Sequence, residues 1–348
     1  MSNYTKHLVT KYNTVKEILL RLDFLASEAI VFLVNEENRL LGAITDGDIR
    51  RGLIKGLNLE DKPEKFMNDR PRFIRKDSFT LEEIIAYRKQ HIRVIPVLNK
   101  SKQVVNVVNF DFFKSYLPIH AVIMAGGRGS RLKPLTDSTP KPMLSIGDKP
   151  IIEHNLDRLR TFGIDHFSIS IRYLGAQIVD YFKDGSDKNI EIEYLNEDEP
   201  LGTIGALAGK NDYKHDTVLV TNSDLLTNLD YEEFYLHFQD QEADISVVTI
   251  PYQVNIPYAV VETGDDLIVG FKEKPTYTYY SNAGIYLIKS RILDRIPKGT
   301  FYNATDLLES VMKSGGRVSS FNFQGYWLDI GRKEDFDKAK EDIKNIRF

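Results

Sequence analysis

The 348-residue sequence contains no cysteine and no long apolar run. The lack of cysteine excludes disulfides, thiolate metal sites and cysteine nucleophiles. No apolar segment approaches the ~20 residues needed to span a bilayer. The first residues, MSNYTKHLVTKY, lack the apolar core of a signal peptide. We therefore expect a cytoplasmic protein with no membrane partner.

The sequence also lacks an excess of positive charge. It has 46 Lys and Arg against 50 Asp and Glu, a formal net charge of −4. This balance gives no reason to expect nucleic acid as a partner, so any site for an anion must be local. The length exceeds that of one typical domain and suits two.

The first third of the chain carries a diverged internal repeat. We expect a helix, a strand, a turn and a second strand over residues 14–45, and the same order over residues 80–110. Asn35 and Asn99 open equivalent turns, so the offset is 99 − 35 = 64 residues. Neither copy could bury its sheet alone, so the two copies should pack as a pair.

This repeat resembles a tandem CBS (Bateman) module, which would cover residues 1–117. The run GAITDGD, residues 42–48, fits that family's G-x-x-T-x-x-D pattern, and the second copy lacks the pattern. The resemblance implies one site for an adenine or guanine nucleotide effector, with Thr45 on a phosphate and Asp48 on the ribose hydroxyls. It also implies a homodimer, because such modules often pair face to face. A purely structural or dimerising module is the alternative.

Residues 118–348 are expected to form a second domain. From Ala121 to Tyr252 short strands alternate with helices, one of them TIGALAG at residues 203–209. Strands joined through helices imply a mostly parallel sheet covered on both faces. Tyrosine-rich strands after Tyr252 predict an antiparallel extension, and a last helix is expected at about Lys333–Ile343. The expected fold class is thus α/β, preceded by an α+β pair.

A glycine-rich, cationic run follows the first strand of this domain: HAVIMAGGRGSRLKPLTDSTPKP, residues 120–142. Glycines let backbone amides approach a base and its phosphates, and Arg131 and Lys141 can bind phosphate oxygens. Arg128 could simply face water. A Walker A loop is absent, and a dinucleotide fingerprint begun at Gly127 would need glycine where Leu132 stands. A nicotinamide dehydrogenase is therefore set aside.

This run resembles the G-G-x-G-x-R-L-x-P-L-T…P-K-P signature of the sugar-phosphate nucleotidylyltransferases, the nucleotide-sugar pyrophosphorylases. The resemblance implies a Rossmann-like nucleotidyltransferase domain, with Arg131 and Lys141 drawing charge toward departing pyrophosphate. Glu197, close in sequence to the segment EPLGTIGAL, could accept from guanine N1 and N2, and a solvated acidic face is an equal alternative. The residues implied for nucleotide binding are Ala125, Gly126, Gly127, Gly129, Ser130, Glu197, Gly202 and Asn222.

Two aspartates in separate motifs are implied to hold Mg²⁺. Asp224 lies in TNSD and Asp329 in WLDIG, 329 − 224 = 105 residues apart, so only folding can join them. Alone, Asp224 could as easily be a turn residue. The resemblance places a magnesium-binding aspartate at each position. Two converging carboxylates would repel each other unless a cation lay between them.

The sugar-phosphate side of the site is expected on three further segments. FKEKP, residues 271–275, resembles a family element that places Lys274 on the sugar's phosphate and Glu273 on a sugar hydroxyl. NAGIY, residues 282–286, adds Asn282. IPYAVVE, residues 256–262, adds Ala259 and Glu262. Departures from the family pattern at Ala259, Ser223 and Arg332 affect the prediction of which sugar is bound, not the prediction of the reaction type.

Together the motifs imply an enzyme that transfers a nucleotidyl group from a nucleoside triphosphate to a sugar 1-phosphate. EPLGTIGAL, residues 199–207, looks closest to guanylyltransferases, so GTP is favoured. Glucosamine 1-phosphate or mannose 1-phosphate would be the acceptor, for sugars of lipopolysaccharide, capsule or flagellar glycan. A uridylyl-, thymidylyl- or cytidylyltransferase is one alternative, and a non-catalytic nucleotide-sensing regulatory protein is another. The implied catalytic residues are Arg131, Lys141, Asp224, Lys274 and Asp329.

Overall fold

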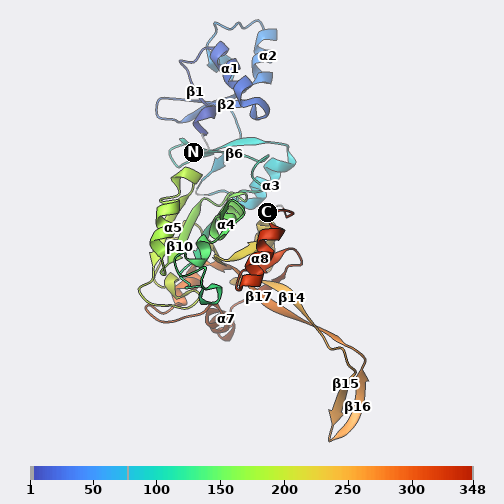
Figure 1. The fold of residues 1–348 in the computed structure, drawn as a ribbon. Coiled ribbons are helices and arrows are strands. Elements are labelled where there is room, and N and C mark those ends of the chain that lie inside the picture. Colours follow the sequence, from blue (N-terminus) through green and yellow to red (C-terminus); the bar gives the residue numbers. More distant parts are fainter. Residues whose placement is uncertain (1–3, 77, 347–348) are drawn as a thin grey trace. The chain divides into compact units, whose positions relative to one another are not determined.

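The computed structural model describes residues 4–76 and 78–346 and divides into two compact units (Figure 1). The first unit is Met1–Pro118 together with two short segments, Arg160–Asp165 and Gly185–Glu191. The second unit contains the remaining residues up to Phe348. The two short segments come from within the expected second domain, and nothing in the sequence pattern assigns them to the first unit.

The first unit contains two three-stranded sheets with the same strand order. In each sheet the first strand pairs in parallel with the second, and the second pairs antiparallel with the third. The first sheet is β1 (Leu8–Thr10), β2 (Ile30–Val34) and β3 (Leu40–Thr45). The second sheet is β4 (Ile74–Arg75), β5 (Val94–Leu98) and β6 (Val104–Asn109). This is the helix–strand–turn–strand repeat expected from the sequence.

The hairpin turns of the two copies are joined by reciprocal backbone hydrogen bonds. Leu40 N donates to Lys102 O at 3.0 Å, and Val104 N donates to Asn38 O at 2.9 Å. Each donor and each acceptor has its counterpart 64 residues away. Asn38 and Lys102 both have positive φ, 59° and 61°, as tight turns require. The two hairpin turns and the hydrogen bonds between them are therefore related by approximate twofold symmetry.

Three α-helices of the first unit each begin at a threonine that caps the helix. In helices α1 (Val15–Leu25), α2 (Asp46–Ile54) and α3 (Leu81–Lys89), the threonine side chain accepts from the backbone N–H three residues on. The acidic side chain at that position accepts from the threonine N–H in return. Helix α2 follows β3, whereas the described residues between β6 and Pro118 contain no helix. The second copy therefore lacks the helix that follows Thr45 in the first, and Asn109 and Phe112 stand at the positions that correspond to Thr45 and Asp48.

The second unit is organised around a seven-stranded sheet in the order β11-β10-β7-β12-β17-β14-β18. Strands β10, β7 and β12 are parallel to one another, and β14 is parallel to β18, while β17 runs antiparallel to both β12 and β14. The sheet is therefore mostly parallel, as expected. Its strands are β7 (Ile119–Met124), β10 (His166–Ile171), β11 (Glu191–Asn196), β12 (Thr217–Asn222), β14 (Ile245–Asn255), β17 (Thr276–Lys289) and β18 (Val318–Asn322).

Helices connect these strands, and one of the helices expected from the sequence does not form. The helices are α4 (Ile151–Arg160), α5 (Gly175–Phe182), α6 (Tyr231–Asp240), α7 (Ala304–Lys313) and α8 (Lys333–Asp342). The helix expected at residues 203–209 is wrong, because only a short 3₁₀ turn forms there, at Gly205–Leu207. Gly202 has φ +81°, and a Cβ on it would lie 2.6 Å from Tyr302 O. Close backbone packing, not helical periodicity, therefore fixes this segment.

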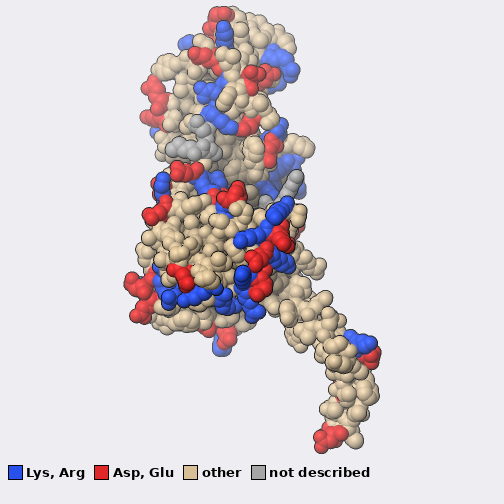
Figure 2. Space-filling view, in the orientation of Figure 1, with Lys and Arg blue, Asp and Glu red and all other residues tan. Residues whose placement is uncertain are grey.

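A long β-ribbon extends from the sheet (Figure 1). The outer halves of β14 and β17 pair with each other, and β15 (Val260–Gly264) and β16 (Leu267–Lys272) form the hairpin at its end. We call residues 252–280 the arm. Its large apolar side chains are exposed, and Figure 2 shows charge on it mainly toward its outer end. The exposed apolar side chains of the arm include Tyr252, Tyr258, Leu267, Val269, Phe271 and Tyr279. Among the described residues, no helix is both long and apolar enough to cross a membrane.

Candidate functional site

A cavity of about 350 Å³ opens in the second unit at the carboxyl ends of the parallel strands β7 and β12. Ligands bind at this edge of open α/β sheets, where chain segments diverge to helices on either face. The lining residues are Met124, Gly126, Gly127, Lys141, Pro142, Arg172, Glu197, Pro200, Gly202, Thr203, Asn222, Ser223, Asp224 and Phe301.

The glycines of the loop after β7 allow the walls of this cavity to approach closely. A Cβ on Gly126 would lie 2.6 Å from Glu197 Oε1. Gly129 has φ +65°, and a Cβ there would lie 2.8 Å from Lys141 Cβ. A side chain at either position would push away a group that faces the cavity. Gly127 has no atom within 4 Å of its Cβ position, so only open space lies there.

Lys141 lies between Asp224 and Asp329. Its ammonium group forms an ion pair with Asp224 Oδ2, and its Nζ is 3.9 Å from Asp329 Oδ1. Lys141 is buried, with 9% of its surface exposed. A buried ammonium is costly unless carboxylates pair with it, which explains why the three groups lie together.

A short ladder brings the two aspartates together across 105 residues of sequence. Strand β13 (Leu225–Thr227) pairs antiparallel with β19 (Trp327–Asp329), so that Leu225 is opposite Asp329. Ile330 N also donates to Asp224 O at 3.0 Å. The ladder is supported by an apolar cluster that includes Leu226, Leu328 and Phe336 of α8. The aspartates therefore meet because buried neighbours on each strand pack against the same core.

The electrostatics of this cluster favour a further cation. Burial raises the pKa of the Asp329 carboxyl, the charge of Asp224 raises it further, and Lys141 and Arg131 oppose both effects. Within residues 4–76 and 78–346, the buried Asp329 Oδ1 has no hydrogen-bond partner. A buried carboxylate oxygen without a donor beside a second carboxylate is the oxygen donor set that Mg²⁺ prefers. The residues present therefore fit a hard divalent cation.

Arg131 lies on the short turn Ser130–Leu132 beside this cluster, and its side chain is exposed. A Cβ on Gly331 would lie 3.7 Å from both Arg131 Nη1 and Asp329 Oδ1, so the guanidinium and the carboxylate face the same space. Ser130 is exposed and does not line the cavity, and neither does Gly129 or the buried Ala125.

Glu197 is buried, so the alternative of a solvated acidic face is wrong for this residue. Its carboxylate accepts from the Ser170 hydroxyl, and its Oε2 also accepts from Leu201 N at 3.3 Å. It lines the cavity opposite Gly126. Glu197 therefore shapes the wall, whether or not it also contacts a bound base.

Several lining residues were not singled out from the sequence. Arg172 directly follows β10, and its Nε is buried without a partner among the described residues. A cation after a parallel strand, at the same sheet edge as Asp224, is a signal that could have identified it. Thr203 and Phe301 lack such a signal, because only the close approach of the segments around Gly202 and Tyr302 places them here.

The residues expected on the sugar-phosphate side are not brought to the cavity. Ala259, Glu262, Glu273 and Lys274 are exposed on the arm, where Glu262 forms an ion pair with Lys272 at 2.5 Å. Asn282 lies on β17. It donates to the Tyr286 hydroxyl at 2.8 Å and accepts from Gly284 N at 2.9 Å, outside the cavity lining. Their roles stay predictions.

Thr45 and Asp48, in the first unit, are engaged with each other. Thr45 Oγ1 donates to Asp48 Oδ2 at 2.6 Å, and Asp48 Oδ1 accepts from Arg51 at 2.6 Å. This arrangement caps α2, so the helix alone accounts for both residue types. Binding of a nucleotide by this pair stays a prediction.

Comparisons with known proteins match the part of the chain that holds the cavity. The family model described as "Nucleotidyl transferase" matches residues 120–346. The chain is 32% identical over 231 residues to mannose-1-phosphate guanylyltransferase from Mycobacterium tuberculosis, covering 65% of this chain and 64% of that protein. It is 31% identical over 253 residues to UTP–glucose-1-phosphate uridylyltransferase from Synechocystis, covering 66% and 65%. The chain thus spans less than two thirds of the length of these relatives.

A solved structure has the same fold over this region. The crystal structure of HddC from Yersinia pseudotuberculosis, complexed with GMP-PN, is 27% identical. It superposes with a TM-score of 0.51 and covers 65% of this chain and all of that one. These matches do not reach the greater part of the first unit, since the family match begins at residue 120.

Proposed function

Since the chain belongs to the nucleotidyl transferase family, we propose that it transfers a nucleotidyl group from a nucleoside triphosphate to a sugar 1-phosphate. A phosphate oxygen of the sugar phosphate would form a bond to the α-phosphorus. The bond from that phosphorus to the bridging oxygen would break, and pyrophosphate would leave with the electron pair. The acceptor oxygen is already ionised near neutral pH, so the reaction needs no general base.

The observation that carries this proposal is the cluster of Lys141, Asp224 and Asp329 at the edge of the cavity. The chemical difficulty is the repulsion between two polyanions at one phosphorus, so catalysis consists mainly of positioning and charge neutralisation. Lys141 and Arg131 would supply fixed positive charge toward departing pyrophosphate. Lys274 on the arm would hold the sugar phosphate.

We propose Mg²⁺ as the cofactor, held by Asp224 and Asp329. When bound, the ion would neutralise phosphate charge at the point where the two substrates meet. Lys141 already pairs with both carboxylates. It would keep them from repelling each other before the ion arrives, and could then turn toward phosphate.

GTP is the proposed nucleotide, with mannose 1-phosphate or glucosamine 1-phosphate as acceptor, in the synthesis of a surface sugar. A guanylyltransferase among the relatives and GMP-PN bound to the similar HddC support the base. A uridylyltransferase at almost the same identity keeps UTP as an alternative. The sugar is the least constrained element, because the residues expected to select it lie on the arm.

The test measures pyrophosphate released by the purified full chain with Mg²⁺. GTP, UTP, dTTP and CTP would each be paired with mannose, glucosamine and glucose 1-phosphates. We expect release only when both substrates are present, fastest with GTP. Asp224→Asn should reduce the rate on the order of 10²–10³-fold. Asp180→Asn, an exposed position on α5, is the matched control and should keep the full rate.

A non-catalytic nucleotide sensor is the competing proposal from another class. It would bind a nucleotide yet release no pyrophosphate with any pair of substrates, and Asp224→Asn would then change no rate. That result would overturn the enzyme assignment. The presence of Lys141, Asp224, Arg131 and Asp329 in one cluster favours the enzyme, since a sensor has no need of them all.

We further propose a cytoplasmic homodimer with a nucleotide effector at Thr45 and Asp48. Calorimetry of the full chain with AMP, ATP and GTP, compared between wild type and Asp48→Asn, tests the effector. Equal heats in the two proteins with every nucleotide would remove it. Sedimentation equilibrium tests the oligomer, and a mass of one chain at all concentrations would exclude the dimer.

A further inference from the structure

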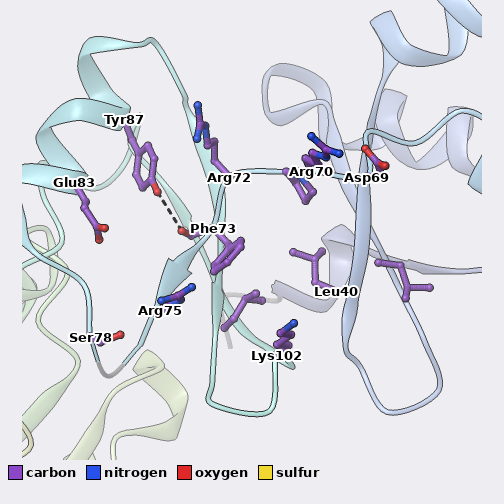
Figure 3. Close-up of a pocket in the computed structure, with 13 residues that line it drawn as sticks. Leu40, Asp69, Arg70, Arg72, Phe73, Arg75, Ser78, Glu83, Tyr87 and Lys102 are labelled. Atoms are coloured by element: carbon purple, nitrogen blue, oxygen red, sulfur yellow. Dashed lines mark hydrogen bonds between the residues drawn. The ribbon is translucent and has the colours of Figure 1, made fainter.

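A cationic cavity outside the candidate site lies in the first unit, and its lining includes neither Thr45 nor Asp48. It has a volume of about 620 Å³. Four cations, Arg70, Arg72, Arg75 and Lys102, line it (Figure 3). Two carboxylates, Asp69 and Glu83, lie in the same lining. The local excess of positive charge contrasts with the chain's net charge of −4.

The four cations are available to a ligand. All four are exposed, and none of them forms an ion pair with a carboxylate within residues 4–76 and 78–346. Glu83 is committed elsewhere, because it accepts from Thr80 N at the cap of α3. Exposed cations on a shared wall repel one another, and an anion between them would relieve that repulsion.

The cation-bearing segments are held in place by the fold. Arg75 packs 5.7 Å from the centroid of the Phe73 ring, and the Tyr87 hydroxyl donates to Phe73 O at 3.3 Å. Figure 3 shows Arg72, Phe73 and Arg75 along one extended segment, with Tyr87 on a neighbouring helix and Lys102 on a separate turn. That turn is fixed by its bond to Leu40 N. Burial raises the pKa of Tyr87, and the charges of Arg72 and Arg75 act in the opposite direction.

The related cavity of the first copy provides an internal comparison. It has a volume of about 500 Å³ and contains Lys11 and Val34, the counterparts of Arg75 and Leu98 at the offset of 64 residues. Its cations are already neutralised. Lys11 Nζ lies 3.8 Å from Glu36 Oε1, and Arg39 Nε lies 3.1 Å from Glu37 Oε2.

The second copy has lost these internal anions. Lys100 and Ser101 stand at the positions that correspond to Glu36 and Glu37. The cavity that contains Lys11 and Arg39 is therefore charge-neutral, whereas the cavity that contains Arg75 and Lys102, which Leu40 and Leu41 also line, is cationic. An anionic ligand should discriminate between them.

We propose that the cavity around Arg70, Arg72, Arg75 and Lys102 binds a compact polyanion that carries two or more phosphate groups. Guanidinium groups match phosphate oxygens with paired N–H donors, and several cations around one volume suit adjacent phosphates rather than a single charge. Pyrophosphate and nucleoside triphosphates share this chemistry. The proposal does not rest on the proposed transferase activity, because none of these residues lines the other cavity.

The test is binding of pyrophosphate, tripolyphosphate and GTP to the full chain, followed by calorimetry, with sulfate as the single-anion comparison. Lys141→Met removes a cation from the candidate site and should weaken phosphate binding there, so that the second site contributes more of the measured heat. In that background, Arg72→Ser with Arg75→Ser should weaken tripolyphosphate binding roughly 10- to 100-fold, because two charge-assisted contacts are lost. Lys11→Ser with Arg39→Ser, the matched pair in the first copy, should change it less than about twofold.

Lys100→Glu provides a second variant that leaves the cationic residues intact. It copies the carboxylate of Glu36 on an exposed turn, so it should fold and still weaken binding severalfold. Pyrophosphate binding without GTP binding would identify the short phosphate chain as the ligand. Binding of all three would identify the phosphates of a nucleotide. Equal loss in both matched pairs, binding of sulfate as tight as that of tripolyphosphate, or no binding in the Lys141→Met background would overturn the proposal.

Discussion

At the scale of single residues, the site depends on where side chains are absent as much as on where charges are present. Gly126 and Gly127 are neighbours in the loop after β7, yet their surroundings differ. A Cβ at Gly126 meets Glu197, and a Cβ at Gly127 meets nothing within 4 Å. Comparing Gly126 with Gly127 therefore distinguishes a glycine that packing requires from one that only makes the loop flexible.

Gly126→Ala should destabilise the protein, and Gly127→Ala should not. The new methyl group would displace Glu197, which is buried and accepts from both Ser170 and Leu201 N. We expect a loss of about 1–3 kcal/mol in the free energy of unfolding for Gly126→Ala. For Gly127→Ala we expect a change within about 0.5 kcal/mol. Urea titration of both variants measures the difference, and equal losses would contradict the role assigned to Glu197.

His120, on β7, should make stability depend on pH. Burial lowers its pKa from 6.5 to about 3 in the folded protein. Below pH 6.5 the unfolded chain takes up a proton that the folded chain does not, so stability falls as the pH drops from there toward 3. Between about pH 7.5 and about pH 5.5 this residue should cost about 1.4 kcal/mol.

The comparison that isolates this effect is His120→Gln, because all other groups titrate alike in the two proteins. The wild type should lose about 1.4 kcal/mol more than the variant over that pH interval. Unfolding curves at the two pH values supply the measurement. A parallel decline in both proteins would show that the pKa of His120 is the same in the folded and unfolded states.

At the scale of elements, periodicity predicted which segments form helices and strands, but not how they pair. The runs HFSISI and TVLVTN form β10 and β12 as expected, because a short apolar run and its flanking turns are local features of the sequence. The ladder between Leu225 and Asp329 could not be predicted, since it joins distant segments through a shared apolar core. The helix expected at residues 203–209 failed for the same reason, because Gly202 packs on the backbone of Tyr302.

Helix α6 shows how a local cap fixes an element boundary. Asp230 Oδ1 accepts from Glu232 N at 2.9 Å and from Glu233 N at 3.1 Å. Asp230→Ala removes the acceptor and should cost about 1 kcal/mol, whereas Asp230→Asn keeps an acceptor oxygen and should restore most of that loss. Thermal unfolding of the two variants decides this, and an equal loss in both would show that charge, not the cap, is what α6 needs.

At the scale of the whole molecule, the sequence predicts two domains and a duplicated first domain. The structure divides into two compact units, and the first unit contains two sheets with the same strand order. The sequence also predicts an antiparallel extension after Tyr252, but it does not predict the direction that the arm takes. Alternating tyrosines predict strands, yet they do not say whether those strands fold back on the sheet or extend from it. The charged residues of the cluster around Lys141 were singled out from their motifs, whereas Arg172 was missed because it belongs to none of those motifs.

Shortening the arm separates its structural role from its chemical one. Its residues are exposed, so replacing residues 257–274 by an Asn-Gly turn should change the free energy of unfolding by less than about 1 kcal/mol. If Lys274 binds the sugar phosphate as proposed, kcat/KM for that substrate should fall on the order of 10²-fold. An unchanged kcat/KM would show that neither Lys274 nor Glu273 takes part.

The segments Arg160–Asp165 and Gly185–Glu191, which belong to the first unit although they lie inside the second part of the sequence, limit how far the molecule can be treated as modular. Leu117 N donates to Phe162 O at 2.9 Å, and Phe162 and Ile164 are almost fully buried. A gene fragment that starts at residue 119 would lack Leu117, whose N donates to Phe162 O, and most of the unit to which Phe162 and Ile164 belong. Replacing residues 1–118 by a domain of another protein would therefore require a compatible protein surface as well as a suitable junction in the sequence.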